Sequence, residues 1–206
     1  ATQAAWADHR DFGETQGTSL RVAQSCARHV AISVDPALSG RVVLSADAAN
    51  PQEIDQIAAS TVDGAARIGL KPGLRECWQP VEHAPFSRTL VLTLRIPAHL
   101  DVALEDSGLG DYAIGAIGAL SVEESGMTSI TAESVTGDVR LDLSGAGTVT
   151  LNRVESNRVS ASLSGVGTFR VASGRIGDLA VQNSGAASVA ITPEVENATP
   201  VSYTHL

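Results

Sequence analysis

The segment LDLSGAGTVTL, residues 141–151, is one copy of a repeat that runs through the second half of the chain. Four further copies align with it on a Ser-Gly pair: LEDSGLGDYAI (104–114), VEESGMTSITA (122–132), ASLSGVGTFRV (161–171) and VQNSGAASVAI (181–191). The pairs begin at residues 107, 125, 144, 164 and 184, so the copies follow one another after 18, 19, 20 and 20 residues. A period of this length is typical of solenoid proteins, in which each repeat packs against its neighbours.

Apolar and polar side chains alternate on both sides of each Ser-Gly pair, which is the period-two pattern of a half-buried strand. Each repeat therefore predicts two strands, and the apolar columns are expected to face the interior. The predicted inward columns are Val102, Leu120, Val139, Val159 and Leu179; Leu104, Val122, Leu141, Ala161 and Val181; Tyr112, Ile130, Val149, Phe169 and Val189; and Ile114, Ala132, Leu151, Val171 and Ile191.

Glycine marks the corners between these strands. One column is Gly108, Gly126, Gly145, Gly165 and Gly185, and a second corner carries Gly118, Gly137, Asn157 and Gly177. Glycine, with Asn as its best substitute, is what a corner with positive φ demands, so we expect positive φ in both columns. The fold class predicted is all-β: a single-stranded parallel β-helix, or β-solenoid, with about 19–20 residues per rung.

Residues 1–97 are less regular. Strands are predicted within HVAISV (29–34), RVVLSA (41–46), AARIGL (65–70) and TLVLTLRIP (89–97), and Asn50, Pro51 and Glu53 predict the start of a short helix with a capping box. We expect one solenoid domain over residues 20–192, with irregular rungs over 20–97 and regular repeats over 98–192. An N-terminal extension (1–19) and a C-terminal cap or tail (193–206) would flank it, because Pro193, Glu194, Glu196 and Pro200 discourage further strand addition.

The composition limits the compartment and the partners. The formal net charge of −9 argues against nucleic acid and anionic membranes as partners, and no stretch of 18 apolar residues predicts a transmembrane helix. The chain begins with Ala1, as a mature chain does after removal of a signal peptide. Two cysteines, Cys26 and Cys77, are expected to form a disulfide in an oxidising compartment. A zinc site with His29 and His83 is the alternative, because Cys26-x2-His29 and Cys77-x5-His83 have workable ligand spacing.

A group of carboxylates is the part of the sequence that could bind a cation or act in acid/base catalysis. Glu105, Glu123 and Asp142 occupy one outward column, Asp106 and Glu124 lie beside the first two, and Asp111 follows on the next strand. Like charges about 4.8 Å apart repel one another unless a cation or Arg140 relieves them. The group is therefore a solvated acidic face, a calcium site, or an acid/base pair for glycan cleavage. No cofactor is expected at this group except calcium, and the sequence contains no motif for a catalytic nucleophile, a metalloprotease or a phosphate-binding loop.

The LxLSGxGxVxL segments, preceded by a strand that ends in Ile96-Pro97, resemble the auto-transporter adhesin family with a head GIN domain. The resemblance covers most of the chain, and it implies an exported bacterial β-solenoid, often in the cell envelope, without a catalytic motif or an established ligand. We therefore expect a non-enzymatic binding, adhesin-like or structural module in the periplasm, the outer envelope or the extracellular space. Its partner would be a glycan or an envelope protein.

The alternative function is a polysaccharide-active β-helix enzyme that uses the surface carboxylates. The outward columns count against it, because they consist mostly of Ser, Thr and Ala and lack the aromatic platforms on which sugar rings stack.

Overall fold

The structure is a computed structural model that describes residues 8–74, 77 and 88–202. These residues fold almost entirely as strands, as the repeat predicts. The strands are β1 (Asp8–Gln16), β2 (Ser19–Ala23), β3 (His29–Val34), β4 (Arg41–Ala48), β5 (Ile57–Val62), β6 (Ala65–Leu70), β7 (Val91–Ile96), β8 (Asp101–Asp106), β9 (Leu109–Ile117), β10 (Leu120–Glu124), β11 (Met127–Val135), β12 (Val139–Leu143), β13 (Ala146–Leu151), β14 (Val154–Leu163), β15 (Val166–Val171), β16 (Gly174–Asn183), β17 (Ala186–Ile191) and β18 (Glu194–Ser202); the helix is α1 (Pro51–Asp55).

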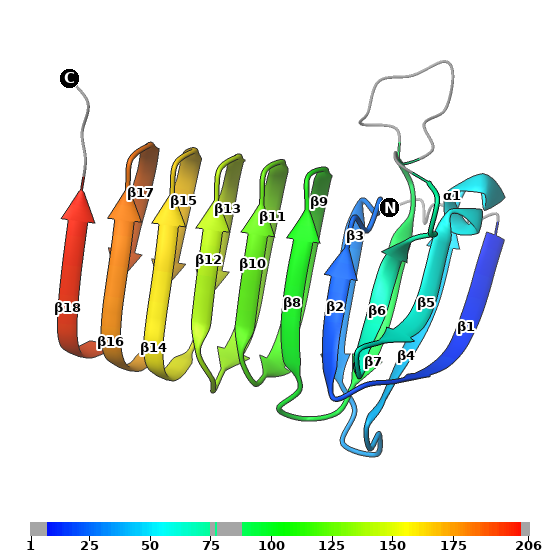
Figure 1. The fold of residues 1–206 in the computed structure, drawn as a ribbon, viewed down its shortest axis with the longest axis horizontal. Helices are drawn as coiled ribbons and strands as arrows, with labels where there is room; N and C mark the ends of the chain where they lie inside the picture. Colours follow the sequence, from blue (N-terminus) through cyan, green and yellow to red (C-terminus); the bar gives the residue numbers. More distant parts are fainter. Residues whose placement is uncertain (1–7, 75–76, 78–87, 203–206) are drawn as a thin grey trace, which may run out of the picture.

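From β8 onward the chain winds as a β-solenoid with two parallel faces (Figure 1). The first face contains β8, β10, β12, β14, β16 and β18, and the second face contains β9, β11, β13, β15 and β17. The pairing follows the sequence repeat, because Leu141 lies opposite Val122 on one neighbouring strand and Ala161 on the other. The predicted fold class is confirmed.

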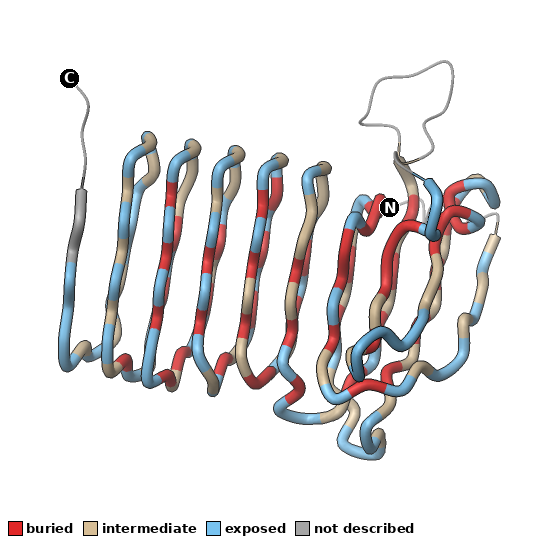
Figure 2. The backbone as a smooth tube through the Cα atoms, viewed as in Figure 1, coloured by how far each residue is buried: buried red, intermediate tan, exposed pale blue. Residues whose placement is uncertain are grey.

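The core is the narrow space between the two faces. Inward side chains such as Leu104, Val122 and Phe169 are fully buried, and buried residues alternate with exposed ones along each strand (Figure 2). The core thins toward the C-terminal end, where Val189 is 36% exposed. The period-two pattern therefore identified the buried columns, but not how well the last rung is covered.

The Ser-Gly corners have a different physical basis from the one predicted. Within the described residues, none of the glycines in the two corner columns has positive φ. A Cβ built on Gly145 would instead overlap the carbonyl oxygen of Gly126, and one on Gly165 would overlap the carbonyl oxygen of Gly145. The same oxygens accept hydrogen bonds from the next rung, from the N–H groups of Ala146 (2.9 Å) and Val166 (3.0 Å). Glycine is required here because successive rungs approach too closely for a side chain.

The rungs of the N-terminal half do not follow chain order. Strand β2 lies between β6 and β8 on the first face, and β3 lies between β7 and β9 on the second face, all in parallel pairing. The chain therefore makes the β2–β3 rung first, builds the β6–β7 rung beyond it, and crosses back to continue as β8. These rungs are irregular, and β7 does not lie directly beside the first regular repeat, because β3 separates it from β9.

Antiparallel strands cover the N-terminal end of the coil. Strand β4 pairs with β7 and with β1, and β5 pairs with β6. Residues 8–16, expected to be part of an extension, thus form an edge strand of the sheet. An antiparallel end interrupts the parallel stacking, so further rungs cannot be added in the same way.

The helix begins as predicted but uses Glu53 differently. The Asn50 side chain caps the helix by accepting from the N–H of Gln52 (3.0 Å), and Pro51 occupies its first turn. The carboxylate of Glu53 is buried and does not return to the cap. It accepts from Thr89 N–H (2.8 Å), Thr89 Oγ1 (2.7 Å) and Leu90 N–H (2.9 Å). No helix in the described part of the chain is long and apolar enough to cross a membrane.

The C-terminal segment continues the coil where a cap or tail was predicted. Residues 194–202 form β18, which lies parallel to β16 with Val195 opposite Ile176 and Ala198 opposite Leu179. The first face is therefore one strand longer than the second face at this end, and Pro193 and Pro200 do not prevent strand formation.

Cys26 and Cys77 form a disulfide with a Cα–Cα distance of 5.5 Å. The disulfide fixes the segment after β6 to the corner between β2 and β3. The predicted pairing is present, and both sulfur atoms are consumed by it, so the alternative of two thiolate ligands to zinc is wrong. His83, the fourth residue of that alternative, lies outside the described residues.

Candidate functional site

Most of the predicted acidic residues lie beside one edge of the solenoid. We call this the Ser-Gly edge; it comprises Ser107–Gly108, Ser125–Gly126, Ser144–Gly145, Ser164–Gly165 and Ser184–Gly185, where the first face turns into the second. Because the rungs are in register, each class of residue next to the corner forms a row along this edge.

The outward row contains Glu105, Glu123 and Asp142 on three successive strands of the first face. This is the stacking that the sequence predicts. The first member is neutralised by Arg21, whose Nη2 lies 2.7 Å from Glu105 Oε1. Arg140, proposed as the relieving cation, lies two residues before Asp142 on β12 and forms no ion pair with any described residue. The partly exposed ion pair between Arg21 and Glu105 adds about 0–1 kcal/mol of stability.

Asp111 does not belong to this group. It is exposed on the second face, opposite His29 on β3 and Ser129 on β11. Across the residues that the structure describes, no three His, Cys, Asp or Glu side chains are placed to share a metal ion. The six carboxylates are thus divided between two faces and the interior, and the calcium hypothesis gains no ligand set.

Asp106 points into the corner rather than outward. Its Oδ2 accepts from Tyr112 OH (2.6 Å), Ser25 Oγ (2.9 Å) and Ser25 N–H (3.3 Å), and its Oδ1 accepts from Gly108 N–H (2.9 Å). Burial, with the negative charge of Asp106 beside it, raises the pKa of Tyr112 well above its usual value. This network joins the β2–β3 corner to the first regular rung, which is a structural task.

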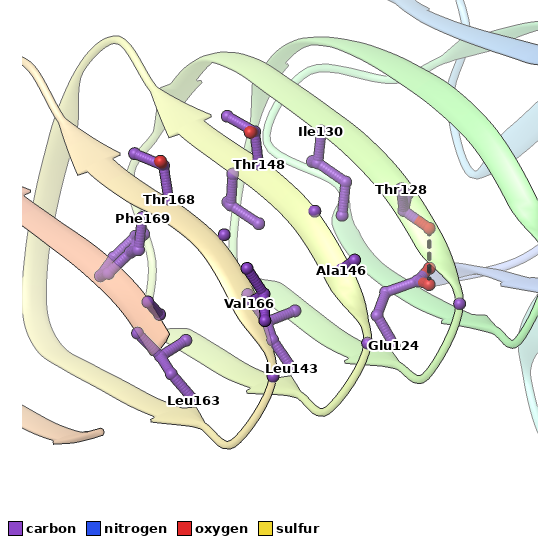
Figure 3. A pocket seen from close by; sticks show the side chains of 17 residues that line it. Glu124, Thr128, Ile130, Leu143, Ala146, Thr148, Leu163, Val166, Thr168 and Phe169 are labelled. Atoms are coloured by element: carbon purple, nitrogen blue, oxygen red, sulfur yellow. Dashed lines mark hydrogen bonds between the residues drawn. The ribbon is translucent and has the colours of Figure 1, made fainter. Parts of the chain in front are cut away.

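Glu124 occupies the same inward row one rung later. It is 6% exposed, and its Oε2 accepts a hydrogen bond from Thr128 Oγ1 (2.8 Å; Figure 3). Its Oε1 is buried and has no hydrogen-bond partner. Burial raises the pKa of Glu124 to about 8; the hydrogen bond from Thr128 lowers it, and the charge of Asp106 raises it further. The carboxyl group is therefore mainly protonated at neutral pH.

The Glu124 side chain faces an internal cavity between the two faces. Leu143, Leu163 and Phe169 line the cavity together with corner glycines, and its volume is about 30 Å³ (Figure 3). It exists because the inward row changes from Glu124 to leucine while Gly126, Gly145 and Gly165 contribute no side chain. A space of this size accepts about two water molecules, so it cannot enclose a sugar.

An open hollow of about 430 Å³ lies on the outer side of the same corner. Polar residues line it, namely Gln24, Arg67, Glu105, Asp106, Ser107, Glu123, Glu124, Ser125 and Ser144. These groups can donate and accept hydrogen bonds to a polar ligand. General acid catalysis also requires an accessible acid with a pKa near the working pH. Glu124, the carboxyl group with a raised pKa, borders this hollow but is only 6% exposed and also faces the internal cavity, which favours binding over catalysis.

The second face is built from parallel strands stacked in register. Its outward side chains include the row Ser129, Thr148, Thr168 and Ser188 on successive strands. Along its rim, Met127 is 55% exposed and Val166 is 62% exposed. Small molecules bind mainly in concave sites, so a flat mixed surface of this kind suits contact with a large partner.

The period-two alternation of the strands already indicates that Asp106 and Glu124 point into the protein interior. Each follows an outward residue directly, and adjacent residues of a strand point to opposite faces. Their partners Ser25, Tyr112 and Thr128 could not be identified in this way. Ser25 comes from another rung, and the hydrogen bonds to Tyr112 and Thr128 depend on how tightly the corner turns.

No protein-family model and no curated protein matches the sequence. Among solved structures, a putative adhesin from Bacteroides fragilis is similar, with 12% identity over 93% of this chain and 95% of that chain and a TM-score of 0.50. A putative adhesin from Parabacteroides distasonis has 10% identity over 95% of both chains and a TM-score of 0.40. At these identities the likeness concerns the fold: this chain shares the β-solenoid architecture of the Bacteroides protein.

Proposed function

We propose that this protein is a non-enzymatic, adhesin-like binding module that contacts a large partner through its second face. The observation that carries the proposal is the flat outward surface of stacked Ser and Thr side chains, held rigid by continuous strand pairing. Many small contacts along such a surface can add up without a deep pocket. The name of the Bacteroides structure supports the same role.

We further propose that the protein is exported to the bacterial envelope or beyond it, as the family with a head GIN domain would be. The disulfide Cys26–Cys77 supports export, because such bonds persist in oxidising compartments. Thiol labelling after expression with and without a secretion signal tests this. Blocked cysteines in the secreted protein and free ones in the cytoplasmic protein are expected.

A glycan array and an array of envelope proteins test the binding role, each with and without calcium. Ser129→Arg and Thr148→Arg place bulky charges on the second face and should weaken binding at least about tenfold, because each disrupts close contact over several rungs. Ser160→Arg, an exposed position on the first face, is the matched control and should bind normally. Equal binding by all three variants would contradict the assignment to the second face.

The polysaccharide-enzyme alternative rests on one observation, the hollow that contains Glu105 and Glu123 with Arg67. Incubation with the glycans that bind, followed by an assay for new reducing ends, separates the two functions. We expect no release of sugars. Turnover that disappears in Glu123→Gln would overturn the non-enzymatic proposal.

A further inference from the structure

Arg88 occupies a second hollow at the Ser-Gly edge, on the side of the second face. Its main-chain position is fixed by its neighbours, because the buried Glu53 carboxylate holds Thr89 and Leu90 with three hydrogen bonds. Its side chain extends over the first regular corner: Arg88 Nη1 lies 3.7 Å from the place that a Cβ on Gly108 would take. The guanidinium group therefore lies within van der Waals reach of this corner.

The guanidinium group of Arg88 has no hydrogen bond or ion pair with any residue that the structure describes, and its Nε is fully buried. The Asp106 carboxylate also lies at this corner, with Oδ1 3.1 Å from the same Cβ position on Gly108, but it already accepts four hydrogen bonds. A partly desolvated cation without a partner is unfavourable, and it is a strong site for an anion.

The surroundings of Arg88 combine hydroxyl groups with apolar side chains. The hollow has a volume of about 480 Å³ and is lined by Ser107 and Ser125, by Leu109 and Met127, and by corner glycines. The serine hydroxyls can donate to a bound oxyanion. Met127, which is 55% exposed, and Leu109 form an apolar wall on the same side.

We propose that this hollow binds a carboxylate carried on a short apolar group, with Arg88 pairing the carboxylate and Leu109 and Met127 contacting the apolar part. A carboxylate suits the site better than a phosphate dianion, because one guanidinium group balances one negative charge. Among the described residues Arg88 is the one cation that lines the hollow, and the Asp106 carboxylate lies close to the same corner. Arginine also binds carboxylates through two parallel hydrogen bonds.

This site goes beyond the binding role of the second face and is tested separately. Amide chemical shifts of the full chain are followed by NMR during titration with hexanoate, with hexanamide as the neutral analogue and acetate and inorganic phosphate as anions without an apolar part. Hexanoate should shift the amides of 107–109 and 125–127 in a saturable way. Hexanamide, acetate and phosphate should bind at least about tenfold more weakly.

Arg88→Gln should abolish the hexanoate shifts, and Met127→Ser should weaken them, whereas Arg170→Gln, an exposed arginine on β15, is the matched control and should leave them unchanged. Thermal unfolding of each variant checks that the fold is intact. Absent shifts, unchanged shifts in Arg88→Gln, or equal binding of acetate or phosphate would each overturn the proposal. Glycan binding through the second face does not enter any of these readouts.

Discussion

Glu124 is a buried carboxyl group in a row that becomes apolar on the following rungs. Leucine occupies the same row on the next two rungs, at Leu143 and Leu163, and there the column is fully apolar. A buried carboxyl group with one unpartnered oxygen weakens the corner unless it carries a proton.

The stability of the protein should therefore fall as pH rises through the neutral range. The folded-state pKa of Glu124 is about 8, against an ordinary value of 4.5. Between these values the unfolded chain releases the proton and the folded chain keeps it, so the free energy of unfolding decreases with pH, by at most about 1.4 kcal/mol per pH unit.

Chemical denaturation at a series of pH values measures this effect. Glu124→Gln, which cannot ionise, should lose this part of the pH dependence and be more stable than the wild type at pH 8. The exposed neighbour Glu123→Gln is the control and should retain the wild-type slope. Parallel pH profiles for wild type and Glu124→Gln would show that Glu124 ionises normally.

Gly145→Val should destabilise the fold by about 2 kcal/mol or more. Its Cβ would overlap the carbonyl oxygen of Gly126, and the rungs cannot separate without losing the hydrogen bond from Ala146 N–H. Ala146→Val, one residue later, is the matched control. That position is exposed and the next rung already carries Val166 there, so the change should stay within about 0.5 kcal/mol. Equal stabilities in urea denaturation would refute the close-approach account.

The positions of the corner glycines could be predicted from the sequence, but the physical reason for glycine there could not. Repetition identified the five corner glycines correctly. Their reason could not be predicted, because positive φ and close approach of a neighbouring strand both select glycine. Only the positions of Gly126 and Gly145 relative to one another distinguish the two.

Strand β1 is held against β4 by a contact whose strength depends on pH. His9 Nδ1 lies 2.7 Å from Asp47 Oδ1 across the β1–β4 pair, and hydrogen bonding to Asp47 raises the pKa of His9 above 6.5. A raised histidine pKa stabilises the folded state at pH values below 6.5, and this contribution is lost as pH rises through the folded-state value.

Protection of β1 amides against hydrogen exchange should accordingly decrease from pH 6 to pH 8, after correction for the intrinsic exchange rate. The strands β8 to β13 serve as the internal control and should keep their protection relative to global unfolding. His9→Gln should remove the pH dependence in β1. Unchanged protection factors for residues 8–16 over this range would mean that the histidine does not hold the strand.

For the molecule as a whole, the regular half was predictable and the N-terminal half was not, for a physical reason. In the regular half, neighbours in space are also neighbours in the repeat, so 18 to 20 residues of sequence determine each contact. The insertion of β2 between β6 and β8 depends on contacts between residues far apart in the chain, and no local pattern encodes that order. The inward direction of Glu124 was readable from alternation, whereas only the folded chain shows that Arg88 has no partner among the described residues.

Strand β18 protects the C-terminal end of the coil. Strand β18 covers one edge of β16, and its Val195 and Ala198 lie opposite Ile176 and Leu179. Deleting residues 193–206 would bare the backbone edge of β16 and the apolar side chains behind it, beside the edge of β17 that is already open. The antiparallel strands at the other end prevent head-to-tail stacking, so the truncated protein should associate tail to tail into dimers.

Light scattering over a range of concentrations measures that association, and the full chain is the reference at each concentration. A lysine on the exposed edge strand, Ala190→Lys in the truncated protein, should return it to the monomer, because a charge there opposes strand pairing. Ser160→Lys, on the outer surface of the first face and away from this end, should not. A truncated protein that stays monomeric and loses no stability would show that β18 contributes nothing to the end of the solenoid.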